Sequence, residues 1–98
     1  MLALEERHLK IVREILSKYP YTFYAFGSRA RGNPKQFSDL DLCFVQSIPQ
    51  QTQSAIETDF EESDLPYKVD LVNWATMSED FKKIIEKDLV LLQESKIG

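Results

Sequence analysis

The stretch GSRARGNPKQFSDLDLCFV, Gly27–Val45, decides how the rest of the chain is interpreted. Its second half places Asp39 and Asp41 before and inside an apolar run that predicts a buried strand. Ionised carboxylates are costly beside a core unless a positive group meets them. The stretch therefore raises the question of which cation these two carboxylates face.

The spacing of the two acids limits the answer. Residues two apart in a strand point to the same face, so Asp39 and Asp41 are expected to project together. Like charges that close must share a proton or a cation. A hard divalent cation such as Mg²⁺ fits, because it takes oxygen ligands and keeps room for phosphate. The pair alone equally fits two solvated acids at the mouth of a strand.

A third acid, Asp70, lies between Val69 and Leu71 in a later apolar run. Asp70 could be a structural residue that pairs with Lys68 or Arg31. Alternatively, three acids on two adjacent strands are the ligands that a two-metal site needs, with cations about 3.5–4 Å apart.

The basic turn before the acids suits a phosphate ligand. Gly27 lets the backbone approach a ligand closely, and Ser28 begins a short helix whose free amide groups favour an anion. Arg29, Arg31 and Lys35 add positive charge. The turn contains neither a Walker loop nor a G-x-G-x-x-G motif, so by itself it fits an ordinary turn equally well.

The rest of the chain predicts alternating helices and strands. Pro20 should end the first helix, and Thr76 with Glu79 forms a capping-box pattern before the last one. The order α-β-(short α)-β-α-β-α predicts an α/β (α+β) fold with a small mixed sheet covered by helices. The expected elements are helices over 9–19 and 49–62, strands over 21–26, 40–45 and 67–74, and a last helix with Phe81, Ile84, Ile85, Leu89 and Leu92 on one face.

Bulk properties exclude several classes of protein. Ninety-eight residues predict a single domain over 1–98, and the net charge of −4 argues against gripping DNA or RNA. The single Cys43, expected in the core, excludes an internal disulfide and a cysteine zinc cage. The terminus MLALEERHLK is unlike a secretory signal, and no apolar run approaches the roughly 20 residues of a membrane span. We therefore expect a cytoplasmic protein that does not contact membranes.

Taken together, the motifs resemble a known family. Gly27-Ser28, Gly32, the SDLDL run over 38–42 and Asp70 resemble the nucleotidyltransferase superfamily of DNA polymerase β. The pattern GS-x-x-x-G followed by SD-x-DL is most similar to its small prokaryotic branch, the minimal nucleotidyltransferases of toxin–antitoxin systems. The resemblance covers nearly the whole chain, and it implies the polymerase β-like fold.

The resemblance also implies roles for individual residues. Two Mg²⁺ ions and ATP are the implied cofactor and substrate. Asp70 would additionally activate the attacking hydroxyl. The implied metal-binding and catalytic residues are Asp39, Asp41 and Asp70. The implied nucleotide-binding residues are Gly27, Ser28, Arg29 and Arg31.

The implied reaction is attack of a hydroxyl on the α-phosphate of ATP, with release of pyrophosphate. By resemblance, the acceptor is a tyrosine of a HEPN-domain ribonuclease toxin, and the protein is its antitoxin. Two alternatives stay open: a non-catalytic nucleotide-binding module that masks its partner, and a stand-alone small-molecule adenylyltransferase. The sequence leaves a homo-oligomer open as well.

Overall fold

The computed structural model describes residues 2–33, 35 and 38–95. Within these residues the chain forms a mixed sheet of four strands in the order β3-β2-β1-β4. β1 (Phe23–Phe26) runs antiparallel to β2 (Leu40–Phe44) and to β4 (Val90–Gln93), and β2 runs parallel to β3 (Val69–Asn73). The predicted fold class, a small mixed sheet with helices, is confirmed.

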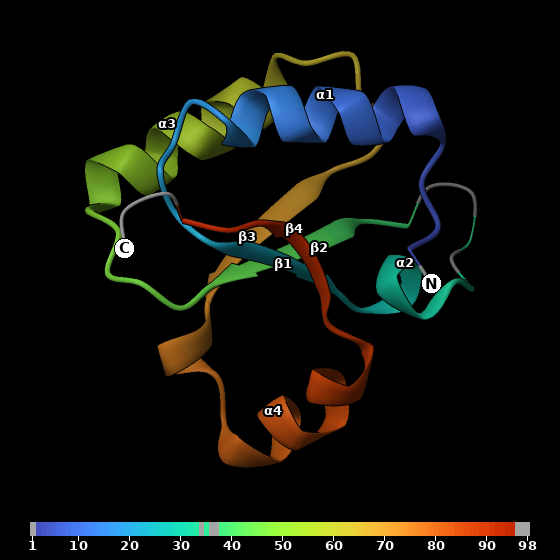
Figure 1. The fold of residues 1–98 in the computed structure, drawn as a ribbon, viewed down its shortest axis with the longest axis vertical. Coiled ribbons are helices and arrows are strands. Elements are labelled where there is room, and N and C mark those ends of the chain that lie inside the picture. Colours follow the sequence, from blue (N-terminus) through green and yellow to red (C-terminus); the bar gives the residue numbers. More distant parts are fainter. Residues whose placement is uncertain (1, 34, 36–37, 96–98) are drawn as a thin grey trace.

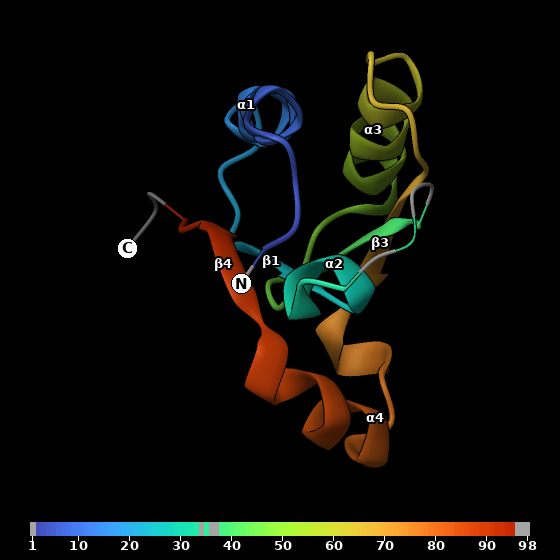
Figure 2. The ribbon, with the colours of Figure 1, turned by 90° about the vertical axis from the view of Figure 1, so that its right-hand side faces the viewer.

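Helices cover both faces of this sheet (Figures 1 and 2). α1 (Glu6–Leu16) and α3 (Gln50–Glu61) lie over one face, α4 (Glu79–Ile85) lies on the other side, and the short α2 (Ser28–Arg31) follows β1. None of the helices in the described part of the chain has the length and apolar character needed to cross a bilayer.

Strand alternation divides the apolar side chains into two clusters. Leu40 and Leu42 are fully buried in the main core under α1 and α3. Cys43, as expected, is buried, and it lies in a smaller cluster with Phe26 and Ile85 of α4. Asp41 is two residues before Cys43 on β2, so its side chain points to the same face of the sheet as Cys43, the face on which α4 lies.

The predicted last helix is only partly correct. α4 ends at Ile85, a 3₁₀ turn follows over Glu86–Asp88, and the apolar residues after it form β4 instead of a helix. β4 pairs with the edge of β1, which would otherwise be open. The Gln93 side-chain amide also donates its two hydrogens to three main-chain carbonyls around the end of α1, at 2.8–3.0 Å, so that two of the carbonyls share one hydrogen. These long-range hydrogen bonds outweigh the helical spacing of Leu89 and Leu92, and no local sequence pattern predicts them.

The predicted capping box is also wrong. Ser78, not Thr76, caps α4, because its hydroxyl accepts from the Phe81 amide at 3.2 Å. Thr76 belongs to a 3₁₀ turn over Trp74–Thr76, where its hydroxyl donates to the Asn73 carbonyl at 2.8 Å. The third strand therefore ends one residue earlier than predicted.

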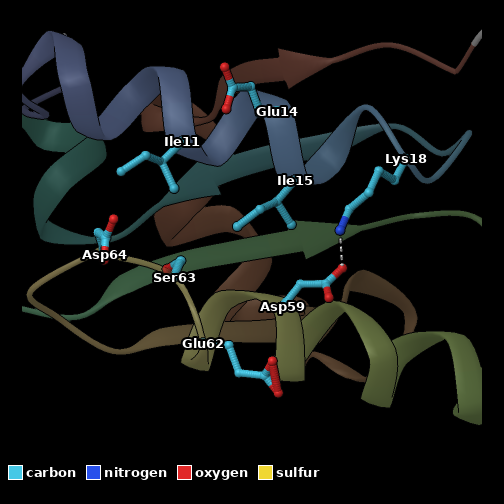
Figure 3. Close-up of a pocket in the computed structure, with 8 residues that line it drawn as sticks. All are labelled: Ile11, Glu14, Ile15, Lys18, Asp59, Glu62, Ser63 and Asp64. Carbon is cyan, nitrogen blue, oxygen red and sulfur yellow. Dashed lines mark ion pairs between the residues drawn. The ribbon is translucent and has the colours of Figure 1, made fainter.

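A polar bridge links α1 to α3 (Figure 3). Lys18, just after α1, makes a 2.8 Å ion pair with Asp59 of α3. The Tyr19 hydroxyl donates to the same carboxylate at 2.5 Å. The hydrogen bonds from Lys18 and Tyr19 lower the pKa of Asp59. The hydrogen bond to Asp59 raises the pKa of Tyr19 to about 12. The groove around this bridge lies between the two helices, on the face of the sheet opposite the Asp41 side chain.

We predict that Asp59→Asn lowers the free energy of unfolding by about 1 kcal/mol at neutral pH, because the charged acceptor of two hydrogen bonds is lost. The contribution of Asp59 is present above the carboxyl's ordinary pKa of 3.8 and is lost as the pH falls through its lowered folded-state value. Urea unfolding at about pH 7 and about pH 3 should therefore show a difference that shrinks with acid. Glu62→Gln, an exposed acid of the same groove, is the control. Equal stability of wild type and Asp59→Asn at neutral pH would contradict this role.

Candidate active site

The two strand acids of the motif lie directly side by side. Asp41 of β2 is the register partner of Asp70 of β3 in the parallel pair, so their side chains leave the same face. Neighbouring strands are about 4.8 Å apart, which puts the two backbone positions close together. Asp39 directly precedes β2 and is exposed. The structure thus places Asp41 and Asp70 side by side on two adjacent strands, with Asp39 just before the first of them.

These carboxylates share one electrostatic environment. The pKa of Asp41 is raised to about 6, mainly by burial and then by the charges of Asp70 and Asp39, while Arg31 opposes the shift. Lys68 makes an ion pair of 3.3 Å with Asp70. Because the Lys68 side chain is 73% exposed, this pair offsets little of the repulsion. The protein's own cations therefore leave part of the negative charge at Asp41 uncompensated.

The glycine-serine turn packs directly against this acid. Gly27 has a φ of 79°, a conformation that disfavours any residue with a side chain. A Cβ atom at Gly27 would also overlap the Asp41 Oδ2 atom. The turn continues into α2, which Gly32 ends at a φ of 86°. The segment that carries Ser28 and the carboxylate of Asp41 therefore belong to one site.

The two arginines of the turn lie in different environments, although both were expected to bind the nucleotide. Arg31 is exposed and acts on Asp41 electrostatically. Arg29 is only 6% exposed, and its guanidinium donates to the Ser38 carbonyl at 2.8 Å. The reason is helical geometry, since residues two apart on a helix point about 200° apart. Arg31 is therefore the arginine whose charge acts on the acids, while Arg29 is held away from solvent.

Tyr67 is a neighbour of the site that the motif does not reveal. Its ring lies 3.8 Å below the Arg29 guanidinium and makes an edge-to-face contact with His8 at 5.5 Å. The only sequence signal is an aromatic residue two positions before the strand that carries Asp70. That signal does not indicate an arginine partner 38 positions away.

The acids fit a divalent cation in chemistry and in backbone position. All three offer carboxylate oxygens, the ligands that Mg²⁺ prefers. Among the residues that the structure describes, however, no three Asp, Glu, His or Cys side chains are arranged closely enough to hold an ion. The support for a cation site is therefore the carboxylate chemistry of the three side chains and the pairing of Asp41 with Asp70.

Comparison with known proteins identifies the family. A family model described as a nucleotidyltransferase domain matches residues 5–92. The chain belongs to this family. It is 43% identical over 99 aligned positions, 97% of this chain and 87% of the relative, to the Haemophilus influenzae protein named probable protein adenylyltransferase MntA. The resemblance predicted from the motifs is thereby confirmed, and the chain is a nucleotidyltransferase.

Solved structures support the same fold. A crystal structure of a toxin–antitoxin with AMP-PNP has a TM-score of 0.68 at 18% identity, over 90% of this chain and 74% of that one. A mutant MntA–HpeT toxin–antitoxin has a TM-score of 0.65 at 20% identity, over 95% of this chain and 75% of that one. At such identities these matches establish a shared fold and no more.

We predict that Asp41→Asn stabilises the protein in EDTA at about pH 7.5, by about 1 kcal/mol after allowance for solvent screening. The folded-state pKa of about 6 lies above the ordinary 3.8, so wild-type stability falls as the pH rises between these values. The asparagine variant should not show this fall, and the two proteins should converge in acid. Melting temperatures of both proteins across the pH range measure this difference in stability. Asp39→Asn is the comparison, and its gain in stability should be smaller because Asp39 is exposed. An asparagine variant less stable than wild type at pH 7.5 is the contrary outcome.

Gly27→Ala should destabilise the fold by at least about 1 kcal/mol, because it adds a Cβ at positive φ and against Asp41. In an Asp41→Ala background the loss should be smaller, since the overlapping carboxylate is gone. Urea unfolding of the four proteins gives the coupling energy. A coupling of zero would mean that the turn and Asp41 do not pack together.

Proposed function

We propose that this chain is a metal-dependent adenylyltransferase that moves AMP from ATP to a hydroxyl group of a partner protein. The acceptor we propose is a tyrosine of a HEPN-domain ribonuclease toxin, which makes the chain an antitoxin. The observation that carries the proposal is the meeting of the Gly27 turn with Asp41 and its register partner Asp70. The relative named as a protein adenylyltransferase supports AMP transfer to a protein.

Each residue has a defined part in this reaction. The Gly27–Ser28 turn and Arg31 bind the triphosphate, because the turn lies against the acids and Arg31 is the exposed cation beside them. Asp39, Asp41 and Asp70 would hold Mg²⁺, which would supply charge neutralisation at the phosphates. These residues position the reactants and compensate charge, which are the main contributions to phosphoryl transfer.

Asp70 has a second part, which is to accept a proton. The hydroxyl oxygen forms a bond to the α-phosphorus, the bond from that phosphorus to the bridging β-oxygen breaks, and pyrophosphate leaves. The hydroxyl proton passes to Asp70, whose side chain is 38% exposed and therefore accessible to an incoming partner. Lys68, at 3.3 Å, orients the Asp70 carboxylate for that role.

Labelled ATP tests the reaction. With Mg²⁺ and the partner toxin, label at the α-phosphate should appear on the toxin with release of pyrophosphate. Asp70→Asn should keep nucleotide and partner binding but slow transfer by at least about 100-fold, or about 2.7 kcal/mol of barrier. Asp64→Asn, in the exposed loop before β3, is the matched control and should transfer normally.

Label that arrives only from the γ-phosphate would exclude nucleotidyl transfer. Full toxin neutralisation by Asp70→Asn at equal expression would favour a masking module instead.

A further inference from the structure

A buried arginine lies behind the candidate site. Arg29 is 6% exposed, so its charge has been removed from water, and that costs free energy unless hydrogen bonds and close partners compensate. Its Nε atom donates to the Ser38 carbonyl at 2.8 Å, and its Nη1 atom donates to the Ala3 carbonyl at 3.3 Å. The face of the guanidinium stacks on the Tyr67 ring at 3.8 Å. A group held this firmly fixes the segments that hold it.

Those segments are the ones that carry the site. Arg29 itself belongs to α2, directly after the Gly27–Ser28 turn. Ser38, which accepts from Arg29, is peptide-bonded to Asp39. Tyr67, which stacks on it, is three residues before Asp70. The side chain of Arg29 therefore connects α2, which follows the nucleotide turn, to the entry to β2 and the entry to β3.

We propose that Arg29 is a positioning residue, which holds these three segments in register so that the turn and the carboxylates of Asp41 and Asp70 form one metal–nucleotide site. It acts through the backbone and not through contact with the ligand. The Leu40 amide also donates to the Lys68 carbonyl at 2.9 Å, so a backbone hydrogen bond joins the entry to β2 to the entry to β3. The inference rests on the proposed function for its catalytic consequence, although not for its effect on metal and nucleotide binding.

The geometry requires arginine in particular. The planar guanidinium donates from Nε and Nη1 to two different carbonyls while its face remains free to stack on a ring. A lysine carries the same charge but has a single ammonium group, which cannot make this arrangement. The backbone reinforces it, because the Ala3 amide donates to the Arg29 carbonyl at 2.7 Å. Charge alone should therefore not replace Arg29.

The test is a Mg²⁺ titration in the presence of AMP-PNP, read from the rise in melting temperature of the intact chain. Arg29→Lys should raise the half-saturating Mg²⁺ concentration by at least about tenfold, and AMP transfer to the toxin should fall by at least about tenfold. Ile56→Val, at a residue of α3 that is buried in the main core, is the control for simple loss of stability. It should lower the melting temperature with and without ligand and leave the Mg²⁺ midpoint unchanged.

Tyr67 supplies a second pair of variants in case Arg29→Lys does not fold. Tyr67→Leu removes the stacking ring and should shift the Mg²⁺ midpoint in the same direction. Tyr67→Phe keeps the ring and removes a buried hydroxyl that has no hydrogen-bond partner among the described residues, so it should bind Mg²⁺ as the wild type does. An unshifted midpoint in a folded Arg29→Lys, or equal midpoints for Tyr67→Leu and Tyr67→Phe, would overturn the inference.

The two proposals fail in different ways. A wild type that binds Mg²⁺ with AMP-PNP but transfers no α-label would end the proposed function, and the Mg²⁺ midpoints would still decide the role of Arg29. A wild type that transfers AMP while Arg29→Lys matches it in both midpoint and rate would end the positioning role alone.

Discussion

Two carboxylates placed opposite each other across β2 and β3 are the constraint on which the rest of the site depends. Asp41 and Asp70 are register partners in a parallel pair, so neither can turn away without disturbing the sheet. The opposite face of β2 is fixed by Leu40 and Leu42, which are fully buried in the main core. The core therefore holds the acids together, although their charges repel.

The surroundings of this pair explain why it suits a cation. The pKa of Asp41 is raised by burial and by Asp70 and Asp39, and Arg31 compensates only in part. Gly27 brings a backbone turn against the same carboxylate. A site with unbalanced negative charge and an adjacent backbone turn costs the apo protein stability. That cost is typical of functional sites, where a ligand restores the balance.

The parts of this structure that sequence predicts are those determined by local pattern. The alternation in SDLDLCF places Leu40 and Leu42 inward and Asp41 outward, and the two glycines of GSRARG mark the two positions with positive φ. The parts that sequence misses depend on partners far along the chain. β4 exists because it completes the edge of β1, 65 or more residues earlier, and α4 is short for the same reason. Arg29 is predicted from its place in the turn to bind nucleotide, but its contacts with Ala3 and Tyr67 could not be predicted from the sequence.

The central claim is that the acids of β2 and β3, with the Gly27 turn, form the cation–nucleotide site. The most direct test is paramagnetic broadening of backbone amide resonances by substoichiometric Mn²⁺, used in place of Mg²⁺ together with AMP-PNP. The account predicts that Gly27, Asp41 and Asp70 broaden first. The α1–α3 groove offers a built-in comparison, because it also carries acids, Glu62 and Asp64 among them. Broadening that begins in that groove and spares the Gly27 turn would contradict the account.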